Sequence, residues 1–151
     1  MAARAARGEA RLVTTPAPSS RLLLVVAAGG AVGALLRWCL GEVVPDGDGF
    51  PWTTFAINVL GAFALAAIPG LVAAGRHPTL TVALGPGLLG GFTTLSAYAE
   101  QARALVDEGA VGLAGAYVVG TLGACLLAVV LGGRLAPVAA RRDFDAHEGN
   151  E

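Results

Sequence analysis

Four long apolar stretches constrain what this chain can fold into. They are Leu22–Leu36, which continues past Arg37 to about Val44, and then Gly49–Gly75, His77–Ala99 and Gly109–Gly133. A bilayer core of ~30 Å is crossed by about 20 helical residues, so each stretch can cross once. Charged residues make up only 14% of the chain, against about 25% in soluble domains. The sequence therefore predicts an all-α membrane protein with four transmembrane helices, and excludes a soluble globule and a disordered chain.

The segments between and around these stretches predict short turns and polar tails. We expect turns at residues 42–48, 75–78 and 100–108, where charges or prolines interrupt the apolar runs. Residues 1–20 read as a disordered basic tail, 21–135 as the four-helix transmembrane domain, and 136–151 as a charged tail. A basic start before an apolar run also resembles a secretory signal or, more weakly, a transit peptide. The three further spans favour an uncleaved first helix.

The third stretch contains an unusual cluster of glycines, in the sequence LGPGLLGGFTT from Leu84 to Thr94. Glycine and proline near the middle of a span disfavour a straight helix. A broken backbone inside a membrane must find partners or line a wet cavity. Transporters use such breaks to direct carbonyls and helix ends at ions, while a simple packing kink is the alternative. We predict a functional break at Gly90–Thr94.

Small residues recur at helical spacing elsewhere in the spans. The pairs Gly29/Gly33 and Gly87/Gly91 would allow helix backbones to approach closely in lipid. A codon usage rich in G and C, which raises glycine and alanine content everywhere, is the other interpretation.

Polar side chains within the spans form three groups. Thr54, Asn58 and Gly61 share one face of the second span. Hydroxyl groups follow the glycine cluster at Thr93, Thr94 and Ser96. A weakly polar stripe runs along the fourth span, formed by Tyr117, Thr121 and Cys125. Each residue alone could merely hold helices together. Three such faces in one small protein predict a shared polar path.

Charges inside the spans are almost absent. Glu42 and Glu100 lie at span ends, and the lack of an intramembrane acid disfavours proton-driven transport. Arg37 is the exception, and it could either extend to the interface or supply positive potential to an anion vestibule. A net charge of −1 gives no electrostatic footprint for nucleic acid.

Three segments together resemble the CrcB/Fluc fluoride channel family. The first is GGAVGALLRW at residues 29–38, the second is TFAINVLGAF at 54–63, and the third is GGFTTLSAY at 90–98. They are similar to the family patterns GGxxGAxxR-aromatic, TxxxNxxGxF and GGxTTFSTF. With the polar stripe of the fourth span, the resemblance covers about residues 22–135.

The resemblance implies an antiparallel dimer with two pores, through which fluoride leaves the cell passively. It implies a structural sodium ion at the dimer centre, held by the main-chain carbonyls of Gly90 and Thr93 from each subunit. Asn58 matches the family's pore asparagine, Arg37 its vestibule arginine, and Thr121 its pore-facing serine. Together with the polar faces, the predicted ion pathway comprises Asn58, Thr54, Thr94, Ser96, Tyr98, Tyr117, Thr121 and Arg37. No residues are assembled for chemistry on a substrate, so we do not expect an enzyme.

This chain departs from the family pattern in ways that bear on its partner. Leu95 and Tyr98 stand where the motif has phenylalanines, and Gln101 stands where a glutamate is expected. Leucine lacks the positive ring edge of an aromatic side chain. One of the two pores would then be degraded, which favours a heterodimer with an oppositely oriented paralogue over a homodimer with tolerated substitutions.

The arginines favour the same partner. The four spans place both termini on one side, together with eight arginines: Arg4, Arg7, Arg11, Arg21, Arg76, Arg134, Arg141 and Arg142. Arg103 lies on the other side, joined at most by Arg37. By the positive-inside rule this imbalance predicts one orientation in the cell membrane, with cytoplasmic termini.

Two other functions remain open from the sequence. A small multidrug-resistance-type exporter would keep the architecture, but it would require a glutamate embedded in the first span, which this chain lacks. A non-conducting membrane subunit would use the polar residues only to hold helices together.

Overall fold

The structure, a computed structural model, describes residues 19–73 and 78–134, and this part of the chain is helical without strands. In chain order, the elements are α1 (Ser20–Val43), α2 (Trp52–Ala73), α3 (Pro78–Val82), the π-helix η1 (Ala83–Leu89), α4 (Gly90–Phe92), α5 (Leu95–Asp107) and α6 (Val111–Arg134). The predicted tails, apart from Ser19 and Ser20 at the start of α1, lie outside the described residues, as does the Arg76 turn.

The helices are long and apolar enough for a membrane protein. Three segments have the length and composition of membrane spans: Ser20–Val43, Thr79–Asp107 and Val111–Arg134. Helix α2 contributes a shorter apolar stretch over Trp52–Ile68. The predicted four-helix arrangement fits these elements, and the protein is an integral membrane protein.

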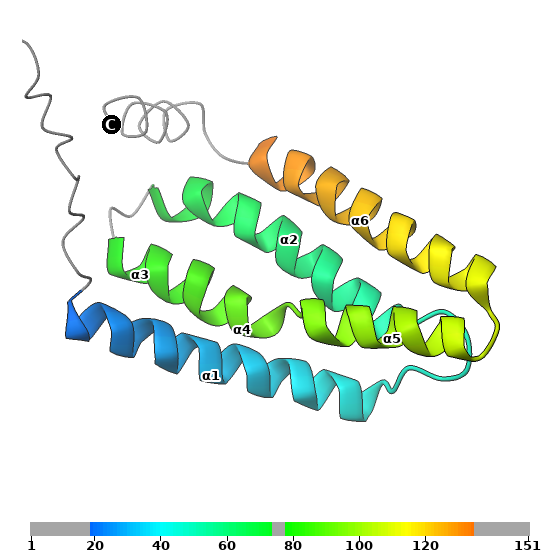
Figure 1. Cartoon of the computed structure of the whole chain (residues 1–151). Coiled ribbons are helices and arrows are strands. Elements are labelled where there is room, and N and C mark those ends of the chain that lie inside the picture. The colour runs from blue at the N-terminus through cyan, green and yellow to red at the C-terminus, as the bar shows by residue number, and fades with distance from the viewer. Residues whose placement is uncertain (1–18, 74–77, 135–151) are drawn as a thin grey trace, which may run out of the picture.

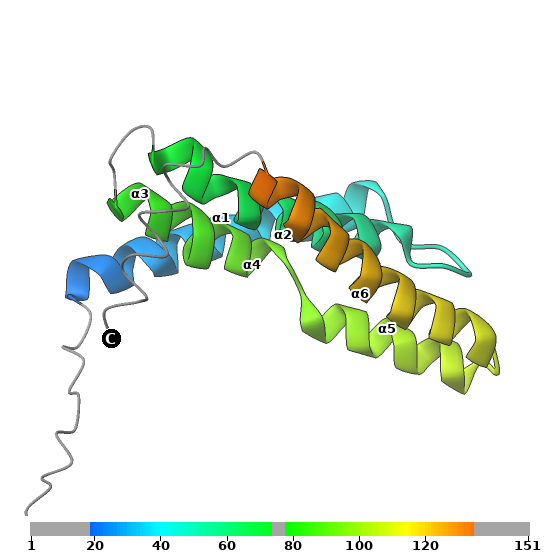
Figure 2. The ribbon, with the colours of Figure 1, turned by 90° about the horizontal axis from the view of Figure 1, so that it is seen from above.

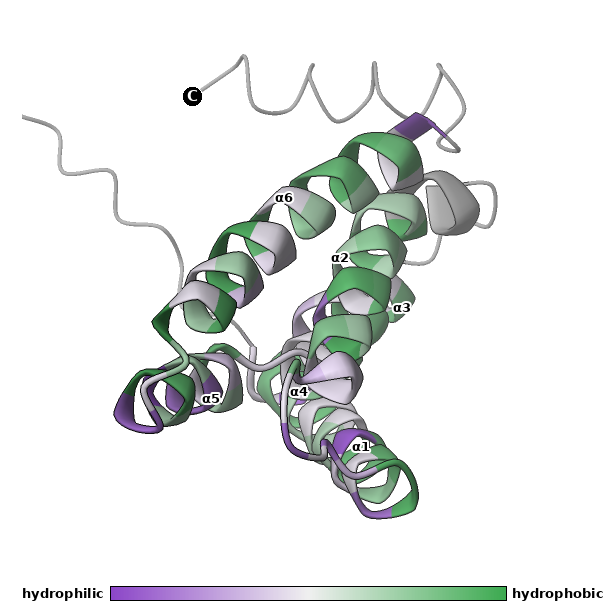
Figure 3. Ribbon diagram, turned by 90° about the vertical axis from the view of Figure 1, so that its right-hand side faces the viewer, coloured by the Kyte–Doolittle hydropathy of each residue, from purple (hydrophilic) through white to green (hydrophobic). Residues whose placement is uncertain are grey.

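The helices pack as two layers that meet at the third span. Helix α1 packs against η1 and α4, whereas α2 packs along α6, and α6 also contacts α5 (Figure 1). Seen from above, α5 does not continue the line of α4 but is displaced from it by a short extended link (Figure 2). The end view shows α1 and α5 on separate sides, with mostly apolar residues along α2 and α6 and hydrophilic residues in α5 (Figure 3). The third span therefore consists of two helical parts, joined near its middle by the extended residues Thr93 and Thr94.

Close packing of α1 on the third span depends on glycines. A Cβ added at Gly33 would overlap the carbonyl oxygen of Leu88, and one added at Gly29 would lie 2.6 Å from the carbonyl oxygen of Ala83. A Cβ at Gly91 would likewise overlap the carbonyl oxygen of Gly30. The glycine spacing therefore has a packing role here, whatever the codon usage.

We expect Gly33→Leu to prevent stable packing of α1 on the third span. The obstacle is backbone, which cannot rotate away, and overpacking of this kind costs about 1–3 kcal/mol or more. Thermal unfolding of the detergent-purified protein should show a clear loss of stability. Gly41→Leu, at a position in the same helix with nothing within 4 Å of an added Cβ, is the matched control. Equal stability of the two variants would contradict this account.

The glycine cluster itself is helical, and the extended residues follow it. Residues 83–89 form a π-helix that includes Pro86. The backbone becomes extended at Thr93 (φ −75°, ψ 157°) and Thr94 (φ −145°, ψ 119°), between the end of α4 and the start of α5. The carbonyl of Leu89 accepts from both the amide and the hydroxyl of Thr93, at 3.0 and 2.9 Å, and so closes the helix.

The turn predicted at residues 100–108 is wrong, because α5 continues as helix to Asp107. Arg103 pairs with Glu100 one turn before it and with Asp107 one turn after it. Leu105 is buried on the opposite face. Polar residues that interrupt the apolar run therefore form the outer face of an amphipathic helix, and the chain turns only at Gly109, where φ is 79°.

Candidate functional site

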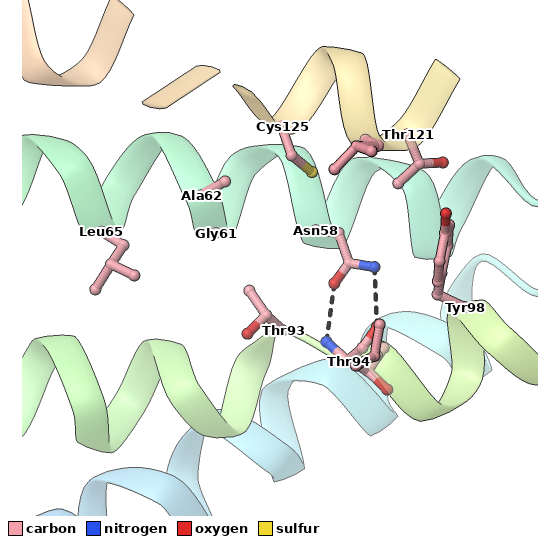
Figure 4. A pocket seen from close by; sticks show the side chains of 11 residues that line it. Asn58, Gly61, Ala62, Leu65, Thr93, Thr94, Tyr98, Thr121 and Cys125 are labelled. Carbon is pink, nitrogen blue, oxygen red and sulfur yellow. Dashed lines mark hydrogen bonds between the residues drawn. The ribbon is translucent and has the colours of Figure 1, made fainter. Parts of the chain in front are cut away.

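Asn58 bridges the extended link between α4 and α5. Its side-chain amide donates from Nδ2 to the carbonyl of Thr94 at 3.0 Å, and its Oδ1 accepts from the amide of Thr94 at 2.8 Å (Figure 4). Two backbone groups that an unbroken helix would pair internally are thus paired by one side chain from α2. A broken backbone in a membrane needs such partners, since unpaired amides and carbonyls are costly there.

The hydroxyl groups after the glycine cluster also serve the break. Thr94 caps α5, because its Oγ1 accepts from the amide of Ala97 at 3.1 Å. The hydroxyl of Ser96, which is exposed, lies 3.2 Å from that of Thr94. This capping, together with the Thr93 bonds to Leu89, stabilises both helix ends at the break.

A cavity of about 340 Å³ lies beside the break, between α2, α5 and α6. Its polar lining comes from Asn58, Thr93, Thr94, Tyr98, Thr121 and Cys125, and its apolar lining includes Leu65, Leu95 and Leu122 (Figure 4). The tyrosine hydroxyl is held away by donation to the carbonyl of Val118 at 2.9 Å. The cavity therefore joins residues from three predicted polar groups that are distant in sequence.

Thr121 is the unusual member of this lining. The residue is only 3% exposed, and its hydroxyl has no hydrogen-bond partner within the part of the chain that the structure describes. A buried hydroxyl without a partner is unfavourable by roughly 1–3 kcal/mol. A group in this state can donate to a species that enters the cavity.

A second cavity, of about 390 Å³, lies on the α1 side of the break. Its lining includes one cationic and two acidic residues, Arg37, Glu42 and Asp46, together with Thr54, Thr94 and Gln101. Arg37 directs its Nε toward the carbonyl of Gly91 at 3.4 Å, where the backbone is about to leave the helix. Thr94 borders both cavities, so the broken segment separates an arginine-lined space from an amide- and hydroxyl-lined one.

The structure divides the predicted pathway residues between these places. Asn58, Thr94, Tyr98 and Thr121 meet at the first cavity, whereas Arg37 and Thr54 line the second. Tyr117 and Ser96 line neither of these two cavities: Tyr117 is fully buried in a core cluster with Leu105 and Ala114, and Ser96 is exposed beside Thr94.

Sequence reasoning missed the role of Asp46. We expected this residue only as part of an acidic turn, but its carboxylate binds the first amides of α2 and the side chain of Gln101. It lies six residues before the helix begins at Trp52, outside the usual capping position. Local spacing therefore carried no signal for it.

The two cavities contain donors suited to a small anion. The Thr121 hydroxyl is unpaired, Asn58 retains a second N–H beyond the one given to Thr94, and Arg37 supplies a positive charge. Each of these three groups lies beside apolar side chains, and hydrogen bonds and charge interactions are stronger in surroundings of low polarity. The arrangement can replace part of an anion's hydration shell, and it assembles no nucleophile and base for covalent chemistry.

Comparisons with known proteins agree on one family. Residues 24–133 match the family model described as CrcB-like protein, Camphor Resistance (CrcB). A relative from Nocardia farcinica named fluoride-specific ion channel FluC 2 is 44% identical over 127 residues, covering 80% of this chain and 91% of the relative. Relatives named fluoride-specific ion channel FluC from Novosphingobium aromaticivorans and Opitutus terrae are 41% and 40% identical, covering 71% and 74% of this chain and 89% of each relative. With four apolar helices, a Gly-Gly-Phe-Thr-Thr junction and a bridging asparagine in place, this chain belongs to the CrcB-like family.

Proposed function

We propose that this protein is a subunit of a fluoride-selective channel in the cell membrane, which lowers cytoplasmic fluoride by passive efflux. The observation that carries the proposal is the cavity in which the unpaired, buried hydroxyl of Thr121 lies with Asn58. The names of the relatives, which nearly the whole apolar region matches, support the choice of fluoride among anions.

Fluoride is small and strongly hydrated, so a pathway must return the hydrogen bonds that its water gave up. Asn58 and Thr121 would donate to the ion in the first cavity, while Arg37 would be the cationic group of the second, which Glu42 and Asp46 also line. Thr54, Thr94, Ser96 and Tyr98 would shape the route between the two cavities. Tyr117 would act from behind this wall, since its side chain is buried in the core.

A structural sodium ion at the dimer centre is part of the proposal, with Gly90 and Thr93 as ligands through their carbonyls. The residues present fit this role. In an unbroken helix, the amides of Thr94 and Ala97 would pair with those two carbonyls. Instead the amide of Thr94 donates to Asn58, and the amide of Ala97 donates to the hydroxyl of Thr94. Both carbonyls are thereby released from helical pairing, and oxygen ligands of this kind suit a hard cation. The ion would supply positive charge beside the anion path.

The partner in the dimer would be a related subunit of opposite orientation, with this chain's termini in the cytoplasm. Its arginines lie mainly on the side of the termini. Leu95, which is 78% exposed in this chain, offers a surface where the partner's residues could complete the pathway.

Fluoride efflux from liposomes tests the proposal directly. Purified protein, alone and with a co-purified partner subunit, would be reconstituted in vesicles loaded with potassium fluoride. A potassium ionophore would let K+ leave with the anion, and external fluoride would be followed with a fluoride-selective electrode. We expect rapid fluoride efflux from vesicles containing the conducting assembly. Vesicles loaded with potassium chloride and followed with a chloride electrode should show no chloride efflux. Absence of fluoride efflux from every assembly would overturn the proposal in favour of a non-conducting subunit.

Thr121→Val should separate the effect of the buried hydroxyl on stability from its role in fluoride conduction. Valine has nearly the same shape, so we expect equal or higher thermal stability because an unpaired polar group is removed. Fluoride flux should fall about tenfold, as expected when one hydrogen bond of about 1.4 kcal/mol to the ion is lost. The measurement is paired: melting temperature in detergent and efflux from liposomes. Reduced stability with unchanged flux would show that the hydroxyl has only a structural role.

A further inference from the structure

The connection between α1 and α2 sends a carboxylate into the helical bundle. Asp46 is half-buried there, and its two carboxylate oxygens together accept four hydrogen bonds. Oδ1 accepts from the amide of Thr53 at 2.6 Å. Oδ2 accepts from the amide and hydroxyl of Thr54, at 3.2 and 3.0 Å, and from Nε2 of Gln101 at 3.0 Å. A charged acceptor with four donors forms a strong, well-oriented anchor.

The anchor continues as a hydrogen-bonded chain across two helices. Gln101 of α5 accepts at its Oε1 from the hydroxyl of Tyr117 of α6, at 2.9 Å. The ring of Tyr117 is fully buried and packs on the ring of Tyr98, with centroids 5.2 Å apart. Tyr98 in turn lines the cavity beside Asn58 (Figure 4). Asp46 is thus connected to the cavity wall through Gln101 and two tyrosine rings in contact, which are tilted by 48° to one another.

The carboxylate determines the direction of this chain. Because an ionised carboxylate can only accept, the amide nitrogen of Gln101 must face Asp46 and its carbonyl must face Tyr117. The tyrosine hydroxyl must then donate toward Gln101. Its proton is committed to this bond.

We propose that Asp46 is a positioning residue, which sets the orientation of Tyr117 through Gln101 and thereby holds the ring of Tyr98 at the wall of the ion pathway. This inference rests on the proposed function, since the wall that it concerns is the wall of the fluoride path. It also implies that the Asp46–Gln101 pair carries only one negative charge. A second carboxylate at position 101 would lie at hydrogen-bond distance from that of Asp46 and repel it.

A charge exchange between the two residues tests the proposal. Gln101→Glu places two carboxylates against each other, and Asp46→Asn removes the negative charge and one of the two accepting oxygens that orient Gln101. We expect each single variant to lose fluoride flux by about tenfold, the effect of losing a hydrogen bond to a charged group. The double variant Asp46→Asn with Gln101→Glu restores one charge and one donor, and should recover most of the flux. Asp48→Asn, an exposed position two residues further along the same connection, is the matched control and should behave as the unaltered protein.

Recovery of flux in the double variant would show that Asp46 and Gln101 act as a pair, because only mutually dependent residues give such coupling. Single variants with unchanged flux, or a double variant no better than the singles, would overturn the proposal. Should the charge variants fail to fold, Tyr117→Phe keeps the test open, since it removes one oxygen and should lower flux severalfold. Unchanged flux in folded Tyr117→Phe would equally overturn it.

Thermal unfolding distinguishes failure of this inference from failure of the proposed function. An unaltered protein without fluoride flux in any assembly would overturn the channel function. The melting temperatures would still report on the pairing of Asp46 with Gln101. A lower melting temperature in each single variant and a recovered one in the double variant would support the pairing. A double variant whose loss equals the sum of the two single losses would overturn it.

Discussion

Replacement of Asn58 by Leu should abolish fluoride flux. The side chain that leaves is both the donor proposed for the ion and the group that pairs the amide and carbonyl of Thr94. Leucine can do neither, and it places an apolar group where the ion would lose its water. We therefore expect efflux from liposomes to fall to the level of protein-free vesicles.

The same variant should be less stable but still folded. Two interhelical hydrogen bonds are lost, and such bonds contribute about 1–2 kcal/mol or less each in membranes. Chromatography and thermal unfolding would verify that the variant assembles. Leu60→Ala, at a 61% exposed position of the same helix, is the control for effects on insertion. A folded Asn58→Leu protein with unchanged flux would show that Asn58 only ties α2 to the broken span.

Expression of this chain alone should fail to restore fluoride resistance in cells that have lost fluoride export. The arginine imbalance predicts insertion in one orientation, so two copies would not meet in the antiparallel sense. A C-terminal tag should accordingly be found on the cytoplasmic face alone. Co-expression with an oppositely oriented relative should restore resistance.

Charge changes on the chain itself sharpen this test. Replacing Arg21, Arg76 and Arg134 by Gln reduces the imbalance near the ends of the spans and should produce molecules of both orientations. If the tag then appears on both faces and resistance returns without a partner, orientation is the limiting factor. Full rescue by the unaltered chain, with its tag on both faces, would instead establish a homodimer.

Much of the fold could be predicted because lipid imposes simple requirements. A span needs a certain length of apolar helix, and this requirement is visible in α1, α2, the third span and α6. The failure at residues 100–108 has a physical reason: charge alone does not end a helix. In α5 the side chains of Arg103 and its acidic neighbours point outward and pair along one face, while Leu105 on the other face packs inside.

The candidate site could be predicted only in part. Asn58, Thr94 and Thr121 were predicted as polar residues of separate spans, and the structure brings them to one cavity. Tyr117 was predicted as a pathway residue from its helical spacing with Thr121, but one helical turn toward the start of α6 is enough to bury it against Phe50 and Tyr98. Periodicity gives a helical face, and it does not say how far along that face a cavity extends.

The sequence by itself determined the properties that depend on neighbouring residues: four apolar stretches, a glycine-rich segment that disfavours a regular helix, and the resemblance to one family of channels. The tertiary structure alone decided which groups pair across the bundle. Asn58 meets Thr94 from 36 residues away, and Asp46 meets Gln101 from 55 residues away. These contacts exist because a broken helix and a half-buried carboxylate must have partners in an apolar interior, and only the packing of α2 against α5 and α6 determines which side chains are within reach.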